Sequence, residues 1–275
     1  MLTRSLFALG TLALCAGSAL ADEPRDDIPA FAKELPAFKS GEPIFAFNGK
    51  DLTGFYVYTH DHQRDDPKKV FTVSDGMVRV SGEEYGGFAT KDVFKDYHLT
   101  VEWKWGETTW APREKATRDS GILLHCVGAD GAAGGQWMES QECQLIEGGC
   151  GDFIMVKGKS QPSLTSEVRL GANKQLYYEK GGKTVKSTST RFNWWGRDPE
   201  WKDVLGFRGK RDVEKPAGEW NRMEVICDGS TITNILNGYV VNVGTQSSLT
   251  EGKIQFQSEG AEIFFRKIEI RPLVK

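Results

Sequence analysis

The chain has 275 residues and a formal net charge of −3, from 35 basic and 38 acidic side chains. Because these charges are interspersed and no lysine and arginine cluster stands out, the sequence does not indicate a nucleic-acid-binding groove. The length is sufficient for one large β domain or two small ones with a substantial core. Eight tryptophans, fifteen phenylalanines and seven tyrosines are a large aromatic supply, which most often packs in cores and can also stack on sugar rings.

The first 21 residues have the organisation of a secretory signal peptide. Arg4 precedes an apolar run over residues 6–14, and small residues then end in an A-x-A cleavage site at residues 19–21. The apolar run is too short to span a membrane. A lipoprotein signal at Cys15 is disfavoured because a bulky leucine precedes this cysteine. We therefore expect export to the periplasm or beyond, with no stable membrane insertion and a mature chain that starts near residue 22.

The remainder is predicted to be a short leader followed by one domain. Residues 22–42 are rich in proline and charge and are expected to be extended, which leaves residues 43–275 as the domain. Residues 70–82 form two alternating runs around Asp75-Gly76, a strong hairpin signal. Residues 97–106 alternate apolar and polar side chains over a longer stretch.

The second half of the chain continues this pattern. Asp228-Gly229 and Asn237-Gly238 mark turns between alternating runs, and no stretch has a sustained helical period. Residues 180–220 show little alternation and are expected to form a long inserted loop. Many short strands with frequent turns predict an all-β fold, an antiparallel two-sheet sandwich or jelly roll.

Four cysteines follow the predicted signal peptide, namely Cys126, Cys143, Cys150 and Cys227. In an exported protein they could form disulfides with three alternative connectivities. Three of them, however, lie in strand-like alternation, where a free thiol behaves as a small hydrophobic side chain. We favour buried free thiols, and no Cys/His spacing suggests zinc.

The stretch WMESQECQLIEGGCGDF contains Glu142, Gln144 and Glu147 in the order E-x-Q-x-x-E. Retaining β-glucanases with a concanavalin A-like sandwich carry E-x-D-x-x-E on one strand, with the two glutamates as nucleophile and acid/base. In a strand with Cys143 and Leu145 toward the core, Glu142 and Gln144 would share the open face. Glu147 would lie on the opposite face unless a bulge intervenes.

A neighbouring segment, residues 121–127, could add a histidine to the same face. Strict alternation would put Ile122, Leu124 and Cys126 on one face and Leu123, His125 and Val127 on the other. His125 would then meet Glu142 and Gln144 if the two strands are neighbours. Any solvated sheet, however, also has a polar alternate face, so the pattern by itself does not identify an active site.

The chain resembles the 3-keto-disaccharide hydrolase domain family from about Pro43 to Pro272. The motifs that carry the resemblance are N-G-K-D-L at 48–52, D-S-G-I at 119–122, the E-x-Q strand and Q-S-E-G-A-E-I-F-F-R at 257–266. Each motif alone is weak, and together they are specific. The resemblance implies a concanavalin A-like jelly roll, export, and action on sugars whose C3 hydroxyl is oxidised to a ketone. Since E-x-Q is this family's own form, Gln144 need not be an altered glucanase aspartate.

A 3-keto sugar offers a route to cleavage that differs from the glucanase route. The ketone acidifies the C2 proton, a base removes this proton, the C1 aglycone leaves, and water adds back. This route needs one base, stabilisation of an enolate oxygen and help for the leaving group. The resemblance therefore suggests Glu142 or His125 as the base, Gln144 as a hydrogen-bond partner of the sugar and Arg118 as a stabiliser of the enolate.

Other residues are candidates for binding. Asp119 lies where the family often has asparagine, and Trp137 and Trp194 are candidates for stacking on a sugar ring. A divalent cation held by Glu142, His125 and Asp119 is an open alternative, although such ligands would not identify the ion. A solvated turn is a better explanation of His60 and His62 in THDHQRDDP than a metal site.

Three functions stay open at this point. The first is a hydrolase or lyase that acts on 3-keto-glucosides or 3-keto-disaccharides. The second is a retaining glycoside hydrolase that uses Glu142 and Glu147. The third is a non-catalytic carbohydrate-binding module, since sandwich folds have many functions.

Overall fold

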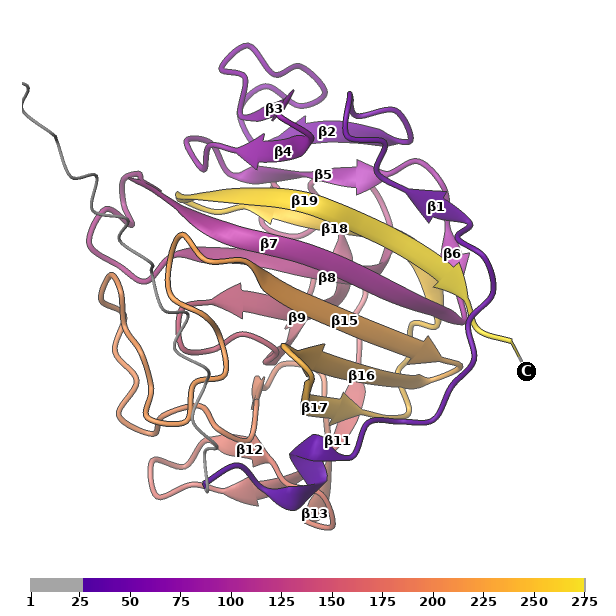
Figure 1. Cartoon of the computed structure of the whole chain (residues 1–275), viewed down its shortest axis with the longest axis vertical. Helices are drawn as coiled ribbons and strands as arrows, with labels where there is room; N and C mark the ends of the chain where they lie inside the picture. Colours follow the sequence, from indigo (N-terminus) through magenta and orange to yellow (C-terminus); the bar gives the residue numbers. More distant parts are fainter. Residues whose placement is uncertain (1–26, 275) are drawn as a thin grey trace, which may run out of the picture.

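The computed structural model describes residues 27–274 and consists almost entirely of β-strands in two stacked sheets (Figure 1). The expected signal peptide, residues 1–21, lies outside the described residues. Within residues 27–274, no helix is long and apolar enough to span a membrane. The two stacked sheets confirm the predicted all-β sandwich.

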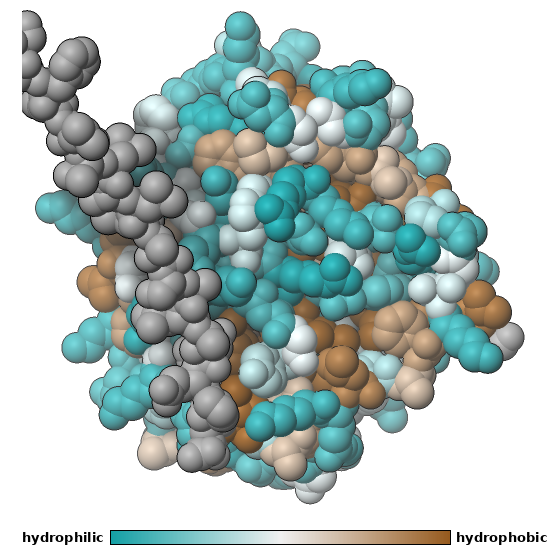
Figure 2. Space-filling model, viewed as in Figure 1, coloured by the Kyte–Doolittle hydropathy of each residue, from teal (hydrophilic) through white to brown (hydrophobic). Residues whose placement is uncertain are grey.

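One sheet has eight strands in the order β17-β16-β15-β7-β19-β4-β3, with β1 paired to β19. Its strands are β1 (Phe45–Ala46), β3 (Phe71–Ser74), β4 (Met77–Val80), β7 (Tyr97–Thr109), β15 (Asn221–Asp228), β16 (Thr231–Leu236), β17 (Tyr239–Gly244) and β19 (Ala261–Pro272). Figure 2 shows hydrophilic side chains over the middle of its outer face. Glu102 and Arg266, which form an ion pair of 2.6 Å, come from this part of β7 and β19.

The other sheet has eleven strands in the order β13-β11-β12-β14-β10-β9-β8-β18-β5-β2, with β6 paired to β18. Neighbours are antiparallel except for β12 and β14. Its strands are β2 (Phe55–Thr59), β5 (Gly86–Thr90), β6 (Phe94–Lys95), β8 (Asp119–Val127), β9 (Glu139–Ile146), β10 (Phe153–Val156), β11 (Leu164–Leu170), β12 (Leu176–Tyr178), β13 (Lys183–Ser187), β14 (Phe192–Asn193) and β18 (Glu251–Ser258).

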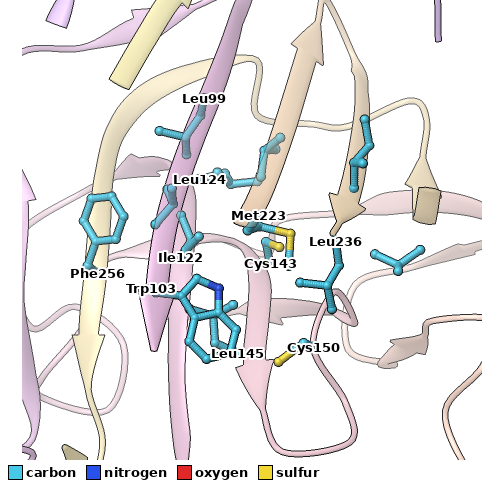
Figure 3. Close-up of a cluster of buried hydrophobic side chains, with 14 of the residues drawn as sticks. Leu99, Trp103, Ile122, Leu124, Cys143, Leu145, Cys150, Met223, Leu236 and Phe256 are labelled. Carbon is cyan, nitrogen blue, oxygen red and sulfur yellow. The ribbon is translucent and has the colours of Figure 1, made fainter. Parts of the chain in front are cut away.

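The hydrophobic core lies between the two sheets. Strand β7 alternates as its sequence predicts and buries five side chains toward the core, Tyr97, Leu99, Val101, Trp103 and Trp105. Figure 3 shows Leu99 and Trp103 of this strand beside Ile122 and Leu124 of β8 and Cys143 and Leu145 of β9. The inward face of β9 is therefore the one that its alternation predicts, which leaves Glu142 and Gln144 on the outer face.

Several local predictions can be compared with the structure. Residues 70–82 form the expected hairpin, and Asp75 and Gly76 adopt the positive φ values of 51° and 74° that its tight turn requires. Residues 180–220 are not wholly a loop, because β13 and β14 lie in their first half. Cys126, Cys143, Cys150 and Cys227 are buried free thiols.

The N-terminal segment packs on the domain. A short 3-10 helix, η1 (Ala30–Lys33), interrupts the stretch that the sequence predicts to be extended. Ala32 is fully buried, and Phe31 contacts Tyr178 and Trp195 edge to face. The described part of the leader thus contributes to the core.

Strand β8 departs from strict alternation. The register between β8 and β9 shifts between Leu124 and Val127, and His125 adopts a left-handed φ of 52°. This bulge turns His125 toward Tyr97 of β7, with ring centroids 5.5 Å apart, and turns Cys126 to the outer face. The predicted faces of His125 and Cys126 are therefore wrong, because one extra residue reverses the alternation.

Candidate active site

A pocket of about 310 Å³ lies on the outer face of the eleven-stranded sheet, over β8, β9, β10 and β18. Polar and apolar side chains of these strands and of the connections that follow them both contribute to its walls. The lining residues are Asp119, Ala133, Gly134, Trp137, Glu142, Gln144, Ile154, Val156, Lys157, Arg191, Gln257 and Glu259. Of the predicted site residues, Asp119, Trp137, Glu142 and Gln144 thus meet in one pocket.

Local sequence explains how β8 and β9 build the pocket floor. Glu142 and Gln144 alternate with core side chains, so both point outward from β9. On β8, Gly121 pairs with Gln144 in the register of the sheet. A Cβ atom at Gly121 would collide with the side-chain oxygens of Glu142 and Gln257. Glycine is therefore what lets these two side chains lie across β8.

The carboxyl group of Glu142 is in an unusual electrostatic position. Glu142 is 3% exposed. Burial, with the nearby charge of Asp119, raises the pKa of its carboxyl group to about 8. Burial also raises the pKa of Asp119, against the opposing effect of Arg113. The pKa of Glu259 is raised well above its usual value by burial and by Asp119 and Glu142. Three acids thus share a site where ionising one disfavours ionising the next.

Asp119 is held by neighbours, whereas Glu142 is not. Gln144 donates a hydrogen bond of 2.8 Å from Nε2 to Asp119 Oδ1, and Arg113 Nη2 lies 3.1 Å from Asp119 Oδ2. Glu142 Oε1 is buried with no hydrogen-bond partner among residues 27–274. Since a buried polar atom without a partner is costly, Glu142 is an exception that a ligand would explain.

Two further buried oxygens in the pocket have no partner in the described part of the chain, namely Gln144 Oε1 and Gln257 Oε1. Together with Glu142 Oε1 they form a set of acceptors. Arg191 lines the same pocket and also donates from Nη1 to Asp152 Oδ2 at 3.1 Å. The pocket thus offers acceptors and a cation to a ligand that carries several hydroxyl groups.

Trp137 reaches the pocket from the connection between β8 and β9. Its indole donates a hydrogen bond of 3.1 Å to the carbonyl of Gly86 and stacks on Tyr85 with centroids 6.2 Å apart. Beneath it lies a small apolar cluster on the outer face, which includes Leu123 and Cys126. The bulge in β8 thus supports Trp137, because it is the bulge that brings Cys126 to this face.

Four predicted residues do not enter the pocket. His125 is fully buried in the core, where burial lowers its pKa to about 4. Trp194 is also a core residue, and its backbone N–H donates to Asp152 Oδ1 at 2.7 Å. The proposed meeting of His125 with Glu142 and the placement of Trp194 at the sugar are therefore corrected by their burial.

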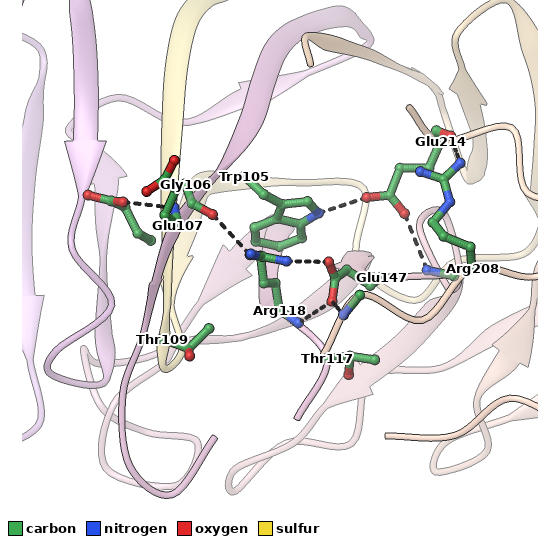
Figure 4. A network of polar contacts seen from close by, with 12 residues as sticks. Trp105, Gly106, Glu107, Thr109, Thr117, Arg118, Glu147, Arg208 and Glu214 are labelled. Atoms are coloured by element: carbon green, nitrogen blue, oxygen red, sulfur yellow. Dashed lines mark hydrogen bonds and ion pairs between the residues drawn. The ribbon is translucent and has the colours of Figure 1, made fainter. Parts of the chain in front are cut away.

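Arg118 and Glu147 form an ion pair (Figure 4), and the contact of Arg118 with β7 of the other sheet places this pair on the side of β8 and β9 that is away from the pocket. Arg118 Nη1 lies 2.7 Å from Glu147 Oε1, and Arg118 Nε donates to the carbonyl of Gly106 in β7 at 2.9 Å. The backbone N–H of Gly206 also donates to Glu147 Oε2 at 2.8 Å. No bulge returns Glu147 to the face of Glu142, so these two glutamates do not form a catalytic pair across one pocket.

The candidate metal ligands are not brought together either. His125 does not join Glu142 and Asp119, and within residues 27–274 no group of three or more histidine, cysteine or acidic side chains could hold a metal ion. His62 Nδ1 lies 2.8 Å from Glu84 Oε2, and His60 Nδ1 lies 2.8 Å from Asp61 Oδ1. Both histidines belong to a turn stabilised by these acids, in line with the interpretation that the sequence favours.

The sequence did not single out Arg191, Gln257 or Glu259. Arg191 lies between β13 and β14, and its approach to β9 depends on how that segment packs. Gln257 and Glu259 belong to the closing Q-S-E-G motif, so a signal for them was present. Gln257 alternates with Phe256, a core residue, and therefore points outward.

The sequence model of the family described as "3-keto-alpha-glucoside-1,2-lyase-like domain" matches residues 42–271. No curated protein matches the chain. Similar solved structures include a "Putative glycosyl hydrolase" from Parabacteroides distasonis, with 19% identity over 86% of this chain and 100% of that chain and a TM-score of 0.47. A Bacillus subtilis protein of unknown function with a galectin-like fold has 13% identity, covers 87% of this chain and 100% of that chain, and has a TM-score of 0.48.

A Bacillus licheniformis β-glucanase has 11% identity, covers 83% of this chain and 97% of that chain, and has a TM-score of 0.43. The family match spans most of the domain, including the strands that line the pocket. The chain therefore belongs to the 3-keto-alpha-glucoside-1,2-lyase-like domain family of glycoside-cleaving, carbohydrate-active enzymes.

Proposed function

We propose that this protein cleaves the glycosidic bond of 3-keto-glucosides or 3-keto-disaccharides, with Glu142 as the base that removes the C2 proton. The observation that carries the proposal is the state of the Glu142 carboxyl group. It is buried in the pocket, its pKa is raised to about 8, and Oε1 has no partner among the described residues. Such a group is poised to accept a proton from a bound ligand.

The reaction balances without an external oxidant or reductant. Glu142 takes the C2 proton, and the electrons of the C–H bond form an enolate with its negative charge on the C3 oxygen. The enolate collapses to the ketone, a C1–C2 double bond forms, and the C1–O bond breaks. The aglycone leaves as an alcohol after it takes up a proton. Addition of water across the C1–C2 double bond makes the net result hydrolysis.

The raised pKa suits the base to this step. A carboxylate with the usual pKa of 4.5 is a weak base for a carbon acid, whereas a pKa of about 8 brings the base closer in strength to the proton it must remove. Near pH 8 about half of the Glu142 groups would be ionised. At this pH the ionised form of Glu142, which is the form that acts as the base, is therefore well populated.

Two further pocket residues have suitable chemistry for the remaining tasks. Arg191 carries a permanent positive charge and would stabilise the oxygen of the enolate, the role that the sequence suggests for Arg118, which is bonded to Glu147. Burial and the nearby charges of Asp119 and Glu142 raise the pKa of Glu259 well above its usual value, which favours its protonated form, and Glu259 would supply the proton to the aglycone.

The amides and Asp119 would orient the sugar. Gln144 Oε1 and Gln257 Oε1 are buried acceptors that need donors, and hydroxyl groups are donors. Trp137 supplies an aromatic wall from the connection above them. These roles explain why the last residue of E-x-Q can be an amide. The Gln144 side chain donates a hydrogen bond to Asp119 through Nε2, and its Oε1 would accept one from the substrate, and neither role needs an ionisable group.

The two alternatives account less well for these features. A retaining mechanism with Glu142 and Glu147 needs two carboxyl groups about 5–5.5 Å apart in one pocket, where they flank the scissile bond, whereas Glu147 is bonded to Arg118 on the other side of the sheet. A binding module has no use for three neighbouring acids whose pKa values are all raised, chiefly by burial. Both remain outcomes of the test.

The test compares methyl 3-keto-glucoside with unoxidised methyl glucoside. Release of the aglycone from the keto sugar alone, with solvent deuterium entering at C2 in heavy water, is the expected result. Cleavage of both sugars without deuterium exchange would support the retaining mechanism. Binding of sugar without cleavage would support a carbohydrate-binding module.

The Glu142→Gln variant tests whether Glu142 is the base in this reaction. The exchange is close to isosteric and the side chain points away from the core, so the fold should be retained. Loss of a positioned base lowers the rate by about 10²–10⁴-fold. Normal turnover by this variant would refute the assignment of Glu142.

A further inference from the structure

A second cavity, of about 350 Å³, lies next to the pocket of Glu142 and has no role in the chemistry described above. Its walls come from four segments that precede or follow strands of the sandwich. The lining residues that matter here are His60, Glu83, Tyr85, Pro112 and Gln136. The two cavities are at the lower end of the range of about 300–1,000 Å³ for ligand pockets.

Adjacent residues place the two cavities side by side. Gln136 lines the second cavity, and the next residue, Trp137, lines the pocket of Glu142. Pro112 lines the second cavity, and the next residue, Arg113, holds Asp119 of the pocket at 3.1 Å. Since two separate connections contribute neighbouring residues in this way, the cavities share a wall.

The wall itself is aromatic. Tyr85 lines the second cavity and stacks on Trp137, with ring planes inclined by 21°. Burial raises the pKa of Tyr85, and the charge of Glu259 in the first pocket adds to the rise. Tyr85 therefore lines the second cavity and, through its stack on Trp137, borders the pocket that holds the acid that would protonate the aglycone.

We propose that the second cavity is the subsite for the leaving group, and that it takes a neutral hydroxylated ring, the second sugar of a 3-keto-disaccharide. This inference rests on the proposed function and deepens it. The Tyr85–Trp137 pair would lie under the bond between the two sugars. Glu259, near Tyr85, would then face the oxygen that leaves.

The lining explains the chemical class of the ligand. The half-buried Gln136 makes no side-chain hydrogen bond to any residue that the structure describes, so its amide can both donate to and accept from hydroxyl groups. Pro112 and Tyr85 offer apolar surface for a ring face. The carboxylates of Asp61, Glu83 and Glu84 line the same cavity and would repel an anionic aglycone.

The test measures binding in the Glu142→Gln protein, because slow turnover allows equilibrium titration by tryptophan fluorescence. The ligands are a neutral 3-keto-disaccharide and methyl 3-keto-glucoside. Adding Gln136→Ala should weaken binding of the disaccharide by about 2- to 10-fold, the value of one neutral hydrogen bond, and leave the methyl glucoside unchanged. Glu83→Gln is a second probe of the same subsite and should act in the same direction, because a carboxylate accepts a hydrogen bond from a hydroxyl group more strongly than an amide does.

Gln161→Ala is the matched control, because Gln161 is an exposed glutamine that lines neither cavity. It should change neither affinity. Equal effects of Gln136→Ala on both ligands, or no effect of either subsite variant on the disaccharide, would overturn the inference. Turnover of methyl 3-keto-glucoside by the unmodified enzyme tests the proposed function alone, so each idea can fail without the other.

Discussion

Replacing Glu142 with glutamine should make the protein more stable at neutral pH. Folding moves the pKa of this carboxyl group from 4.5 to about 8, so the folded state binds the proton more tightly than the unfolded state. Stability linked to Glu142 is therefore fully present below pH 4.5 and is lost as the pH rises toward 8. Glutamine has no proton to lose and does not incur this cost.

The size of the effect follows from the same shift. At pH 7 the free energy of unfolding of the wild-type protein is about 3 kcal/mol lower than it would be without the ionisation of Glu142. Each pH unit between 4.5 and 7 contributes about 1.4 kcal/mol to this loss. For a domain of this size, 1 kcal/mol changes the melting temperature by roughly 2–4 °C. Glu142→Gln should thus raise the melting temperature by roughly 6–12 °C at pH 7. Below pH 4.5 the two proteins should melt together.

Thermal unfolding followed by circular dichroism from pH 4 to pH 9 measures this difference. Glu224→Gln is a control of opposite sign, because contacts with His98 and Arg222 lower the pKa of Glu224 to about 2. Its removal should destabilise the protein above pH 4.5, and the loss should fade as the pH falls toward 2. A difference between wild type and Glu142→Gln that is constant from pH 4 to pH 9 would refute the reasoning.

Four other outcomes can be measured separately. The turnover rate with a 3-keto-glucoside should rise with pH and level off above about 8, and a rate that falls over pH 6–8 would contradict an ionised Glu142 base. His125→Ala should cost about 1–3 kcal/mol in a denaturant melt, as a core substitution, and leave turnover per folded molecule unchanged. Glu147→Gln should cost about 3–5 kcal/mol by leaving Arg118 without its charge partner, whereas complete loss of turnover in the folded variant would revive the retaining mechanism. Mass spectrometry of exported protein should give an N-terminus near residue 22, and an intact Met1 on cytoplasmic protein would argue against export.

Alternation predicted the parts of the fold where the strands are regular. The inward side chains of β7 and the outward Glu142 and Gln144 of β9 follow from the two-residue period alone. The hairpin at Asp75-Gly76 follows from residues that accept a positive φ. In these segments local sequence and tertiary packing demand the same conformation, so reading the pattern suffices.

Prediction failed where a single irregularity changes the face of a strand. A left-handed φ is uncommon at any residue other than glycine, and the regular alternation around His125 does not indicate the bulge that turns it into the core. Trp194 follows β14 in a segment with no alternation, and its burial depends on contacts with Asp152 and Trp195. Long-range packing decides both positions.

The same distinction explains which acid is the base. Glu147 is neutralised by Arg118, Asp152 by Arg191 and Arg197, and Asp119 is held by Arg113 and Gln144. Each of these carboxylates is therefore bonded to at least one partner side chain.

Glu142 lies in the same part of the sheet, yet it points outward from the middle of a regular strand over a glycine and meets no cation within contact distance in residues 27–274. The sheet holds its backbone rigid while burial raises its pKa. The burial that lowers the stability of the folded protein at neutral pH is therefore also what makes Glu142 a stronger base than an ordinary carboxylate. A variant that supplies a partner, such as Ile154→Lys from the pocket wall, should accordingly lower the pKa of Glu142 and slow turnover by weakening the base. A pH–rate profile that rises at lower pH and levels off at a lower maximal rate would support this account. An unchanged profile would refute it.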